Sequence, residues 1–569
     1  MNIQPCDSAT LSQKIWQQRY RQSEAEQSLG DTWWRVARAL AAIETHNVEH
    51  WVGQFFSVMD TLEFIPAGRI IANAGNPEPT TLLNCFVMGP LPNSPSQLAA
   101  ALDESIRTLN FGGGIGCDFS TLLPQGERSP INGEPAPGPI SVMQQWDSAC
   151  ASLLARGGRR GAMMATLHCN HPDIEAFISA KSGPNQLRHF NCSVLVTDEF
   201  IRAVRDNTEW PLVFPPCNNN DTVKFFKTLH ARQLWNGLMQ ATYNYAEPGV
   251  LFIDRINRRN NLYYCETLTA TNPCGEIPLP PYGACDLGSI NLTRFVDRPF
   301  TQQASIKVTR IIEVVKIAVR MLDNVIDCSR YPLSIQAHTA RQSRRIGLGI
   351  MGLGDTLLML NLHYDSVAAR HRAAELMQVI RETAYRYSSE VARERNVFPL
   401  FDAQRLLEAE NTQNLPADIR TDIARYGLHN SHLTAIAPTG SISLLVGNVS
   451  SGVEPIYREQ YHRCIYSTEQ QHTNLLLQDY ACEMWRQHNP DKPLPKSFVT
   501  AEQLSPQAHL QMVTALQPFV DSSISKTINV PGNYNFKDFE TVYLQAYDKG
   551  LKGCTSYRPN QVTGAVLTD

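Results

Sequence analysis

The chain has 569 residues, of which 50 are Lys or Arg and 54 are Asp or Glu, so its formal net charge is -4. This balance argues against a protein that coats nucleic acid, because binding along a phosphate backbone requires surplus positive charge. With 43% hydrophobic and 18% charged residues, the composition is typical of a folded globular protein, not of a disordered chain or a membrane protein. The length allows a sizeable buried core around one large barrel.

Targeting and cysteine patterns favour a reducing compartment. The segment from Met1 to Asp7 shows no basic stretch followed by an apolar one, so we expect a cytoplasmic protein. The 14 cysteines are then expected to be core thiols and catalytic thiols. Cys-x-x-Cys occurs nowhere, which removes the usual zinc-ribbon and thioredoxin signatures. The charge-free stretch 433–453 contains Pro438 and several glycines, so it is not expected to span a membrane.

Residues 31–60 carry apolar side chains at helical spacing, with Asp31 in the expected N-cap position, which predicts a helical N-terminal region. Between residues 63 and 220, short β-type runs alternate with helical stretches, a pattern typical of parallel-sheet units. These runs include CFVMG, NCSVLVT and WPLVF.

Apolar residues recur every three or four positions at 309–327 and 366–395, which predicts two long helices. Polar connections near 401–430 and 486–506 are predicted to lie at the surface. No tandem repeat or low-complexity tract divides the chain. We therefore expect one compact catalytic unit with an N-terminal helical layer.

The segment Asn272 to Glu276 (NPCGE) carries the strongest chemical signal. Its Pro and Gly exclude a helix, so Cys274 lies on a tight loop with a carboxamide two residues before it and a carboxylate two residues after it. In an extended loop these three side chains point to one side. A thiol between an amide and a potential general base suits abstraction chemistry on a polyhydroxylated substrate. A buried apolar cysteine beside an Asn-Pro turn is the alternative interpretation.

A second segment offers an anion site. It provides backbone N–H groups and three hydroxyls before an expected helix, and such a terminus binds anions without formal positive charge. This suits an acidic protein with an anionic substrate, although an ordinary Gly/Ser turn is the alternative. The segment consists of Pro438, Thr439, Gly440, Ser441, Ile442 and Ser443.

Two further patterns are weaker. Gly347 to Gly352 satisfies GxGxxG, but residues 340–345 are mostly polar or basic and no second strand ending in an acidic residue is clear, so we expect these glycines to serve close helix packing. His168 to His171 (HCNH) suggests a metal, but adjacent His and Cys side chains diverge and no second ligand pair has suitable spacing. No metal site is predicted.

The NPCGE loop and the strand ACDLGSINL at 284–292 resemble the active site of ribonucleotide reductase catalytic subunits, especially the adenosylcobalamin-dependent class II enzymes. Further segments fit in the same order, so the resemblance covers roughly residues 30 to 560. They are FIPAGRIIANAG at 64–75, LLNCFVMG at 82–89, FGGGIGCDFS at 111–120, RGGRRGAMMATLHCNHPDIEAF at 156–177, APTGSISLLVGNVSSGVEP at 437–455, and SKTINVP and GLKGCTSYRPN near the end.

The resemblance implies an α/β fold, a ten-stranded α/β barrel with the Cys274 loop threaded through its centre, where a radical is shielded from solvent. The domain organisation that follows is an N-terminal helical region at 1–62, the barrel catalytic domain at 63–560 and a short C-terminal tail at 561–569.

Residue roles follow from the same resemblance. Cys274 corresponds to the thiyl-radical cysteine that removes the 3′-hydrogen of the substrate ribose. Glu276 corresponds to the carboxylate that takes the 3′-hydroxyl proton, and Asn272 to the amide that holds the ribose hydroxyls. Cys85 and Cys285 correspond to the reducing pair that becomes a disulfide as the 2′-hydroxyl leaves as water.

Substrate binding is assigned by resemblance to Asn84, to the loop 438–443, and to Gly113 and Gly114, where a side chain would block approach. Residues 156–164 resemble the loop through which a deoxynucleotide effector changes base preference. The predicted effector contacts are Arg156, Arg159 and Arg160, together with Asn93, which occupies roughly the place where relatives often carry an Asp.

We predict a class II ribonucleotide reductase with adenosylcobalamin as its radical source. Alternatives are a class I catalytic subunit served by a metal-containing radical subunit, a catalytically silent reductase-like binding subunit, and an NAD-linked dehydrogenase built on Gly347 to Gly352. The implied partners are a diphosphate or triphosphate ribonucleotide, a deoxynucleoside triphosphate effector and a second copy in a homodimer, with no nucleic acid and no membrane. Since no Cys-x-x-Cys follows Cys554, a thioredoxin-type reductant or a companion subunit is expected to reduce the Cys85–Cys285 pair again.

Overall fold

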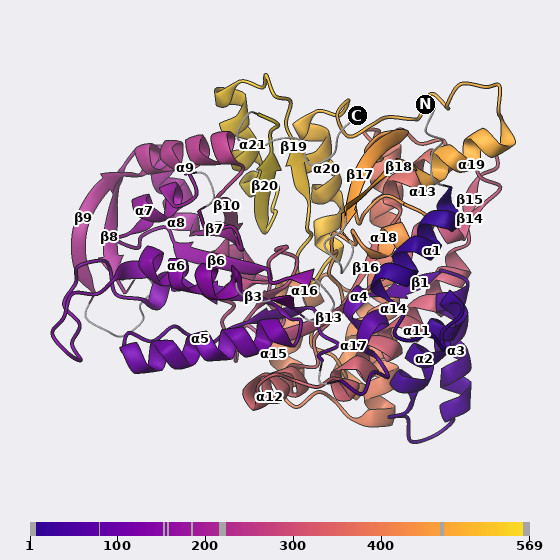
Figure 1. Cartoon of the computed structure of the whole chain (residues 1–569), viewed down its shortest axis with the longest axis horizontal. Coiled ribbons are helices and arrows are strands. Elements are labelled where there is room, and N and C mark those ends of the chain that lie inside the picture. The colour runs from indigo at the N-terminus through magenta and orange to yellow at the C-terminus, as the bar shows by residue number, and fades with distance from the viewer. Residues whose placement is uncertain are drawn as a thin grey trace.

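A computed structural model of the chain is the basis for the architecture (Figure 1). The N-terminal helices lie on one side of the molecule with the long helices of the middle of the chain, and a mixed α/β half lies on the other side. The structure describes residues 7–78, 80–151, 154–155, 159–183, 186–215, 223–466 and 472–560.

Three helices open the chain: α1 (Ser8–Arg19), α2 (Leu29–Ala41) and α3 (Val48–Asp60). The helical prediction for 31–60 is confirmed as two helices, but Asp31 is not the N-cap. Ser28 is the cap of α2, and its hydroxyl accepts from the Asp31 N–H while the Asp31 carboxylate accepts from the Ser28 N–H. Asp31 occupies the third position of this capping box, where an acidic residue also suits the helix dipole.

The centre of the fold is a ten-stranded sheet in the order β1-β13-β2-β3-β6-β7-β10-β20-β19, with β16 on the other edge of β13. Strands β2, β3, β6, β7 and β10 run parallel to one another, as the alternating pattern predicted. The bounds are β1 (Phe64–Pro66), β2 (Cys85–Val87), β3 (Gly114–Asp118), β6 (Met163–His168), β7 (Phe190–Val196), β10 (Gly249–Phe252), β13 (Ala284–Asn291), β16 (Ile346–Met351), β19 (Thr527–Asn529) and β20 (Gly553–Tyr557).

Two bridges link the ends of this sheet. Leu348 of β16 pairs with Thr434, and Ile436 pairs with Ile524 in the segment that leads into β19. Residues 433–436 therefore lie between the first and last parts of the sheet and connect them. The predicted ten-stranded α/β barrel is confirmed.

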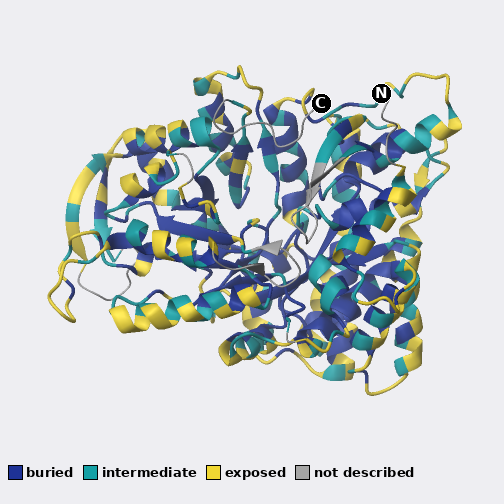
Figure 2. Cartoon of the chain, in the orientation of Figure 1, coloured by how far each residue is buried: buried dark blue, intermediate teal, exposed yellow. Residues whose placement is uncertain are grey.

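The central strands are buried on both faces, because helices cover the outside and the chain fills the inside (Figure 2). The predicted long helices are present as α11 (Val308–Cys328) and α14 (Val367–Arg395), and α2 and α3 pack against α11. None of the described helices is both long enough and apolar enough to cross a membrane.

Three local predictions need correction. WPLVF forms β8 (Glu209–Phe214), which pairs with β9 (Lys224–His230) in a separate hairpin outside the barrel sheet. The connection at 401–430 contains short helices, and Asn411 within it is buried against Arg259 and Asn261. The GxGxxG segment is the buried strand β16, and the close approach that Gly349 permits is to another backbone segment and not to a helix, because an added Cβ there would lie 2.3 Å from the Ala435 carbonyl oxygen.

Candidate active site

The Cys274 loop is held at its base by a short hairpin, β11 (Ala270–Thr271) with β12 (Pro278–Leu279). The loop enters the barrel beside β3 at Gly116, where an added Cβ would lie 2.0 Å from the Thr271 carbonyl oxygen. Only glycine permits so close an approach of two backbones. The finger loop predicted from the resemblance is therefore present in the barrel.

Hydrogen bonds from distant elements fix the loop in place. The Asn191 side chain donates to the Pro273 carbonyl at 2.8 Å, and the Ser523 N–H donates to the Glu276 carbonyl at 2.8 Å. Within the loop, the Asn272 side-chain oxygen accepts from the Ile277 N–H at 3.0 Å. Cys274 is left exposed at the tip, while Asn272 and Glu276 are buried.

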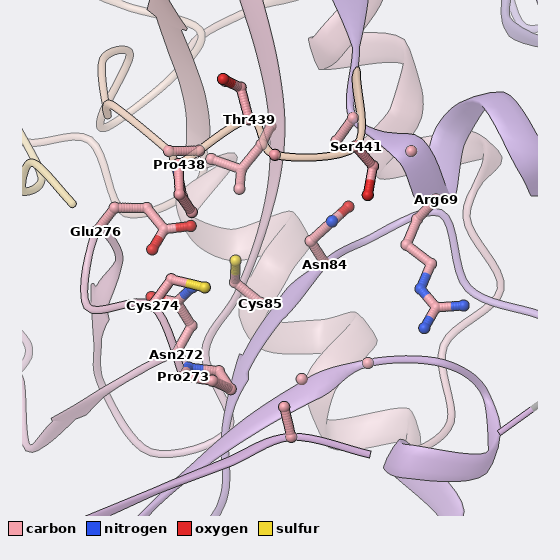
Figure 3. A pocket seen from close by; sticks show the side chains of 18 of the residues that line it. Arg69, Asn84, Cys85, Asn272, Pro273, Cys274, Glu276, Pro438, Thr439 and Ser441 are labelled. Atoms are coloured by element: carbon pink, nitrogen blue, oxygen red, sulfur yellow. The ribbon is translucent and has the colours of Figure 1, made fainter. Parts of the chain in front are cut away.

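A cavity of about 180 Å³ opens around this tip (Figure 3). The three predicted catalytic residues of the loop, Asn272, Cys274 and Glu276, all line this cavity. The lining also contains Cys85, Asn84, Gly113 and Gly114. In Figure 3, Cys274, Glu276 and Cys85 lie on one side of the view, and Ser441 and Arg69 on the other. One end of the cavity thus carries the predicted catalytic thiols and carboxylate, and the other end carries a hydroxyl and a guanidinium group.

Cys85 and Cys285 face each other across neighbouring strands. They are directly paired in the antiparallel register of β2 and β13, and both are buried and reduced. Directly opposite residues place their Cβ atoms roughly 4.5–5.5 Å apart on one face of a sheet, close to the separation that a disulfide needs. Burial raises the pKa of both thiols well above the ordinary value, with the negative groups of Glu276 and Asp286 adding to the effect at Cys85. Both sulfurs are thus held as neutral thiols.

Glu276 has the electrostatics of a proton acceptor that works near neutral pH. Burial raises the pKa of its carboxyl to about 7, and a hydrogen bond with Asn272 lowers it in part. Among the described residues, its Oε2 atom has no hydrogen-bond partner, and neither has Oδ1 of Asn84. Both atoms belong to residues that line the cavity, so a bound molecule with hydroxyl groups would satisfy them.

Pro438, Thr439, Gly440, Ser441 and Ile442 all line the cavity, whereas Ser443 does not. The Ser443 hydroxyl lies 3.2 Å from that of Ser451, behind the loop. Thr439 Oγ1 is also engaged, because it accepts from the Gly452 N–H at 2.9 Å. The helix predicted after the loop is the single turn α18 (Ile442–Leu445).

Of the predicted effector residues, Asn93 is fully described, and it is not among the described residues that line this cavity. Asn93 precedes α5 (Pro95–Asn110), and its amide bonds the Thr121 carbonyl and the Leu123 N–H, so the side chain braces the backbone of 121–123. Arg159 and Arg160 form β5, which pairs with β4 (Leu154–Ala155), but their side chains are outside the described residues. Arg156 also lies outside the described residues.

Sequence reasoning missed two arginines. Arg69 lines the cavity and lies within the quoted segment FIPAGRIIANAG, which was the available signal. Arg19 at the end of α1 donates from Nη1 to Ser441 Oγ at 2.9 Å, across a sequence separation of 422 residues. An exposed arginine on a surface helix gives no signal of such a contact in the sequence.

Both histidines of the HCNH segment have hydrogen-bond partners within the protein. His168 Nδ1 lies 2.5 Å from Asn170 Oδ1, and His171 Nε2 lies 3.0 Å from the Leu122 carbonyl oxygen. Across the described parts of the chain, no group of three or more His, Cys, Asp or Glu residues is arranged to hold a metal ion.

A second, larger cavity of about 980 Å³ borders residues 448–455, which follow the anion-site segment 438–443. Its walls combine aromatic and apolar side chains with polar and charged ones, among them Tyr457, Tyr461, Leu504, Asn448, Arg458 and Glu502. Lys526 and Glu454 form an ion pair at 2.6 Å beside it, three residues after the Ser523 contact to the Cys274 loop. The two cavities are therefore neighbours in the fold.

Comparison with known proteins agrees with this geometry. Residues 83–557 match the family described as "Ribonucleotide reductase, barrel domain", and residues 7–79 match "Ribonucleotide reductase, all-alpha domain". The chain belongs to the ribonucleotide reductase family, and the predicted family is confirmed.

Individual relatives refine the match. A vitamin B12-dependent ribonucleoside-diphosphate reductase of Mycobacterium tuberculosis is 35% identical over 570 residues, which cover 96% of this chain and 78% of the relative. One of Thermoplasma acidophilum is 34% identical over 537 residues, covering 91% of this chain and 66% of the relative. A ribonucleoside-diphosphate reductase subunit alpha of Chlamydia pneumoniae is 25% identical, with 94% and 57% covered. The resemblance to the B12-dependent class is confirmed.

Proposed function

We propose that the chain reduces ribonucleoside diphosphates to 2′-deoxyribonucleoside diphosphates by thiyl-radical chemistry, with adenosylcobalamin as the radical source. The observation that carries the proposal is the convergence of Cys274, Glu276 and Asn272 on one cavity with Cys85, itself paired with Cys285. The relatives named for diphosphate substrates and for vitamin B12 support the choice of substrate and cofactor.

The chain's own residues account for each step at the ribose. Cys274 as a thiyl radical removes the 3′-hydrogen, and Glu276 accepts the 3′-hydroxyl proton at its unbonded Oε2. Cys85 and Cys285 supply two electrons and two hydrogens, so that the 2′-hydroxyl leaves as water and the two thiols become one disulfide. Return of the 3′-hydrogen from Cys274 restores the radical on its sulfur.

The larger cavity fits a cofactor of the corrin type. Its aromatic and apolar walls, among them Tyr457, Tyr461 and Leu504, suit a flat macrocycle. When bound, adenosylcobalamin supplies the radical equivalent that oxidises the Cys274 thiol. The residues of 448–455 are proposed to hold it, because this segment continues directly from the loop that lines the substrate cavity.

An assay tests this function directly. Purified chain with one ribonucleoside diphosphate and dithiothreitol is expected to form deoxyribonucleotide only when adenosylcobalamin is added. Turnover that ignored cobalamin but required an iron- or manganese-containing protein would instead favour a class I subunit. Tight nicotinamide-dinucleotide binding without reduction would favour a dehydrogenase.

The Glu276 carboxyl predicts a specific pH dependence. Since its pKa is raised from 4.5 to about 7, it is protonated below neutral pH and cannot accept the hydroxyl proton, so kcat/KM is expected to rise with pH through about 7. Glu276→Gln should lose this rise and lower kcat by roughly 10²–10⁴-fold.

Protein stability should follow the opposite trend. The neutral form of Glu276 is favoured in the folded state, so its contribution to stability is present below pH 4.5 and is lost as pH rises through about 7. Thermal unfolding of wild type and Glu276→Gln across this pH range checks the sign of the change in stability.

For the kinetic prediction, a pH–rate profile identical in the two proteins would remove Glu276 from the mechanism.

The family resemblance supports three further proposals. The β4–β5 hairpin with Arg159 and Arg160, together with Arg156 and Asn93, is proposed to sense a deoxynucleoside triphosphate effector. A homodimer is proposed as the working assembly. A thioredoxin-type reductant or a companion subunit is proposed to reduce the Cys85–Cys285 disulfide after each turnover.

A further inference from the structure

The basic end of the substrate cavity has a distinctive charge pattern. Among the described residues that line the cavity, Arg69 is the one cation and Glu276 the one carboxylate. The two lie apart in Figure 3, with Arg69 on the side of Ser441 and Glu276 on the side of Cys274. A substrate with its ribose at Cys274 therefore directs its anionic tail toward Arg69.

The fold reserves space for the Arg69 guanidinium. Arg69 lies in α4 (Gly68–Asn73), and its Nη1 atom would be 2.6 Å from a Cβ added at Gly112. Gly112 has φ +96, a conformation that also excludes most side chains. The absence of a side chain at Gly112 thus leaves room for the guanidinium beside the cavity wall.

Arg19 adds a second positive charge near the cavity, separated from it by the Ser441 hydroxyl. Its Nη1 atom donates to Ser441 Oγ, and a hydroxyl that accepts from an arginine keeps its own proton to donate. Ser441 lines the cavity, so that proton is available to an anionic oxygen there. The helix that carries Arg19 is firmly placed, because Leu11, Ile15 and Trp16 of α1 are buried in the main core.

We propose that Arg69 binds the terminal phosphate of a nucleoside diphosphate directly, and that Arg19 acts as a positioning residue that orients and polarises the Ser441 hydroxyl toward the same phosphate. This inference rests on the proposed function and deepens it, because it identifies which groups recognise the second phosphate. Charge-assisted hydrogen bonds of this kind are stronger and shorter than neutral ones. The N-terminal helical region thereby contributes to the substrate site of the barrel.

The test compares the affinities for CDP and CMP, measured by calorimetry on the full chain. Arg69→Gln is expected to weaken CDP binding by roughly tenfold or more and to leave CMP binding within about threefold, since a hydrogen bond to a charged group has about this worth. Arg19→Gln should act in the same direction with a smaller effect, raising KM for CDP while kcat stays near wild type.

Matched variants separate recognition from folding. Lys14→Gln removes the same charge from the same helix without a place in the cavity lining, and it should leave the CDP to CMP ratio unchanged. Arg69→Lys and Arg19→Lys should restore part of the ratio. Because Arg19 acts through Ser441, the effects of Arg19→Gln and Ser441→Ala on CDP binding should be less than additive.

The possible outcomes distinguish a failure of the proposed function from a failure of the phosphate-binding roles of Arg69 and Arg19. Failure of the wild type to bind CDP or any other ribonucleoside diphosphate would overturn the proposed function and this inference with it. Wild-type binding of CDP with an unchanged CDP to CMP ratio in Arg69→Gln would overturn the inference alone. An Arg19→Gln variant that loses thermal stability but keeps the ratio would reduce Arg19 to a structural contact.

Discussion

Replacing Cys274 by serine is expected to abolish ribonucleotide reduction, with turnover on the order of 10⁴-fold or more below wild type. The hydroxyl occupies nearly the same space at the exposed tip of the loop, so the cavity and its hydrogen bonds are preserved. A serine O–H bond is much stronger than a thiol S–H bond, and the radical cannot form on it. The measurements are deoxyribonucleotide production and exchange of the substrate 3′-hydrogen, both of which should disappear.

Cys265 provides the matched control for this substitution. It is also exposed and reduced, and it does not line the cavity. Cys265→Ser should therefore keep wild-type turnover. Sustained turnover by Cys274→Ser would show that another group carries the radical.

Cys285→Ser is expected to separate the two halves of the reaction. Without the second thiol, the 2′-hydroxyl cannot be removed with formation of a disulfide, so sustained reduction should fall by on the order of 10³-fold. Cys285 lies opposite Cys85 on the neighbouring strand and is not among the described residues that line the cavity, so the 3′-hydrogen should still exchange through Cys274. Product analysis and 3′-exchange on the same sample measure both steps.

The serine hydroxyl at the buried position 285 is expected to lower the free energy of unfolding, and this effect needs its own control. Cys117 on β3 is equally buried and does not line the cavity, so Cys117→Ser reproduces the cost while it leaves the reducing pair intact. Loss of 3′-exchange in a folded Cys285→Ser protein would contradict the separate roles of Cys274 and Cys285.

Local sequence patterns predicted those parts of the fold that local physics determines. The apolar period of three to four residues located α11 and α14 almost to the residue. The Pro and Gly of NPCGE correctly indicated a loop, and its polar neighbours indicated its chemistry. By contrast, the glycines of β16 were misread, because their purpose is contact with Ala435, which no local window contains.

Long-range contacts explain the remainder. The register that pairs Cys85 with Cys285 depends on β2 and β13 meeting in the sheet, and only the family resemblance anticipated it. Arg19 and Ser441 meet because α1 packs beside the turn α18, a consequence of the whole tertiary structure. The capping box at Ser28 was within reach of the sequence, since Ser-x-x-Asp resembles the usual capping pattern.

The anchoring of the Cys274 loop has a consequence for the order in which the protein is made. The loop is synthesised well before its anchors, because its Glu276 carbonyl accepts from the Ser523 N–H, and the carbonyls of the neighbouring Asp521 and Ser522 accept in turn from Nζ of the buried Lys552. A nascent chain that has displayed Cys274 therefore still lacks the clamp that fixes it. The geometry of the Cys274 loop is therefore completed only after Lys552, which immediately precedes β20 (Gly553–Tyr557), has been synthesised, so a nascent chain that ends before Lys552 carries Cys274 on an unanchored loop.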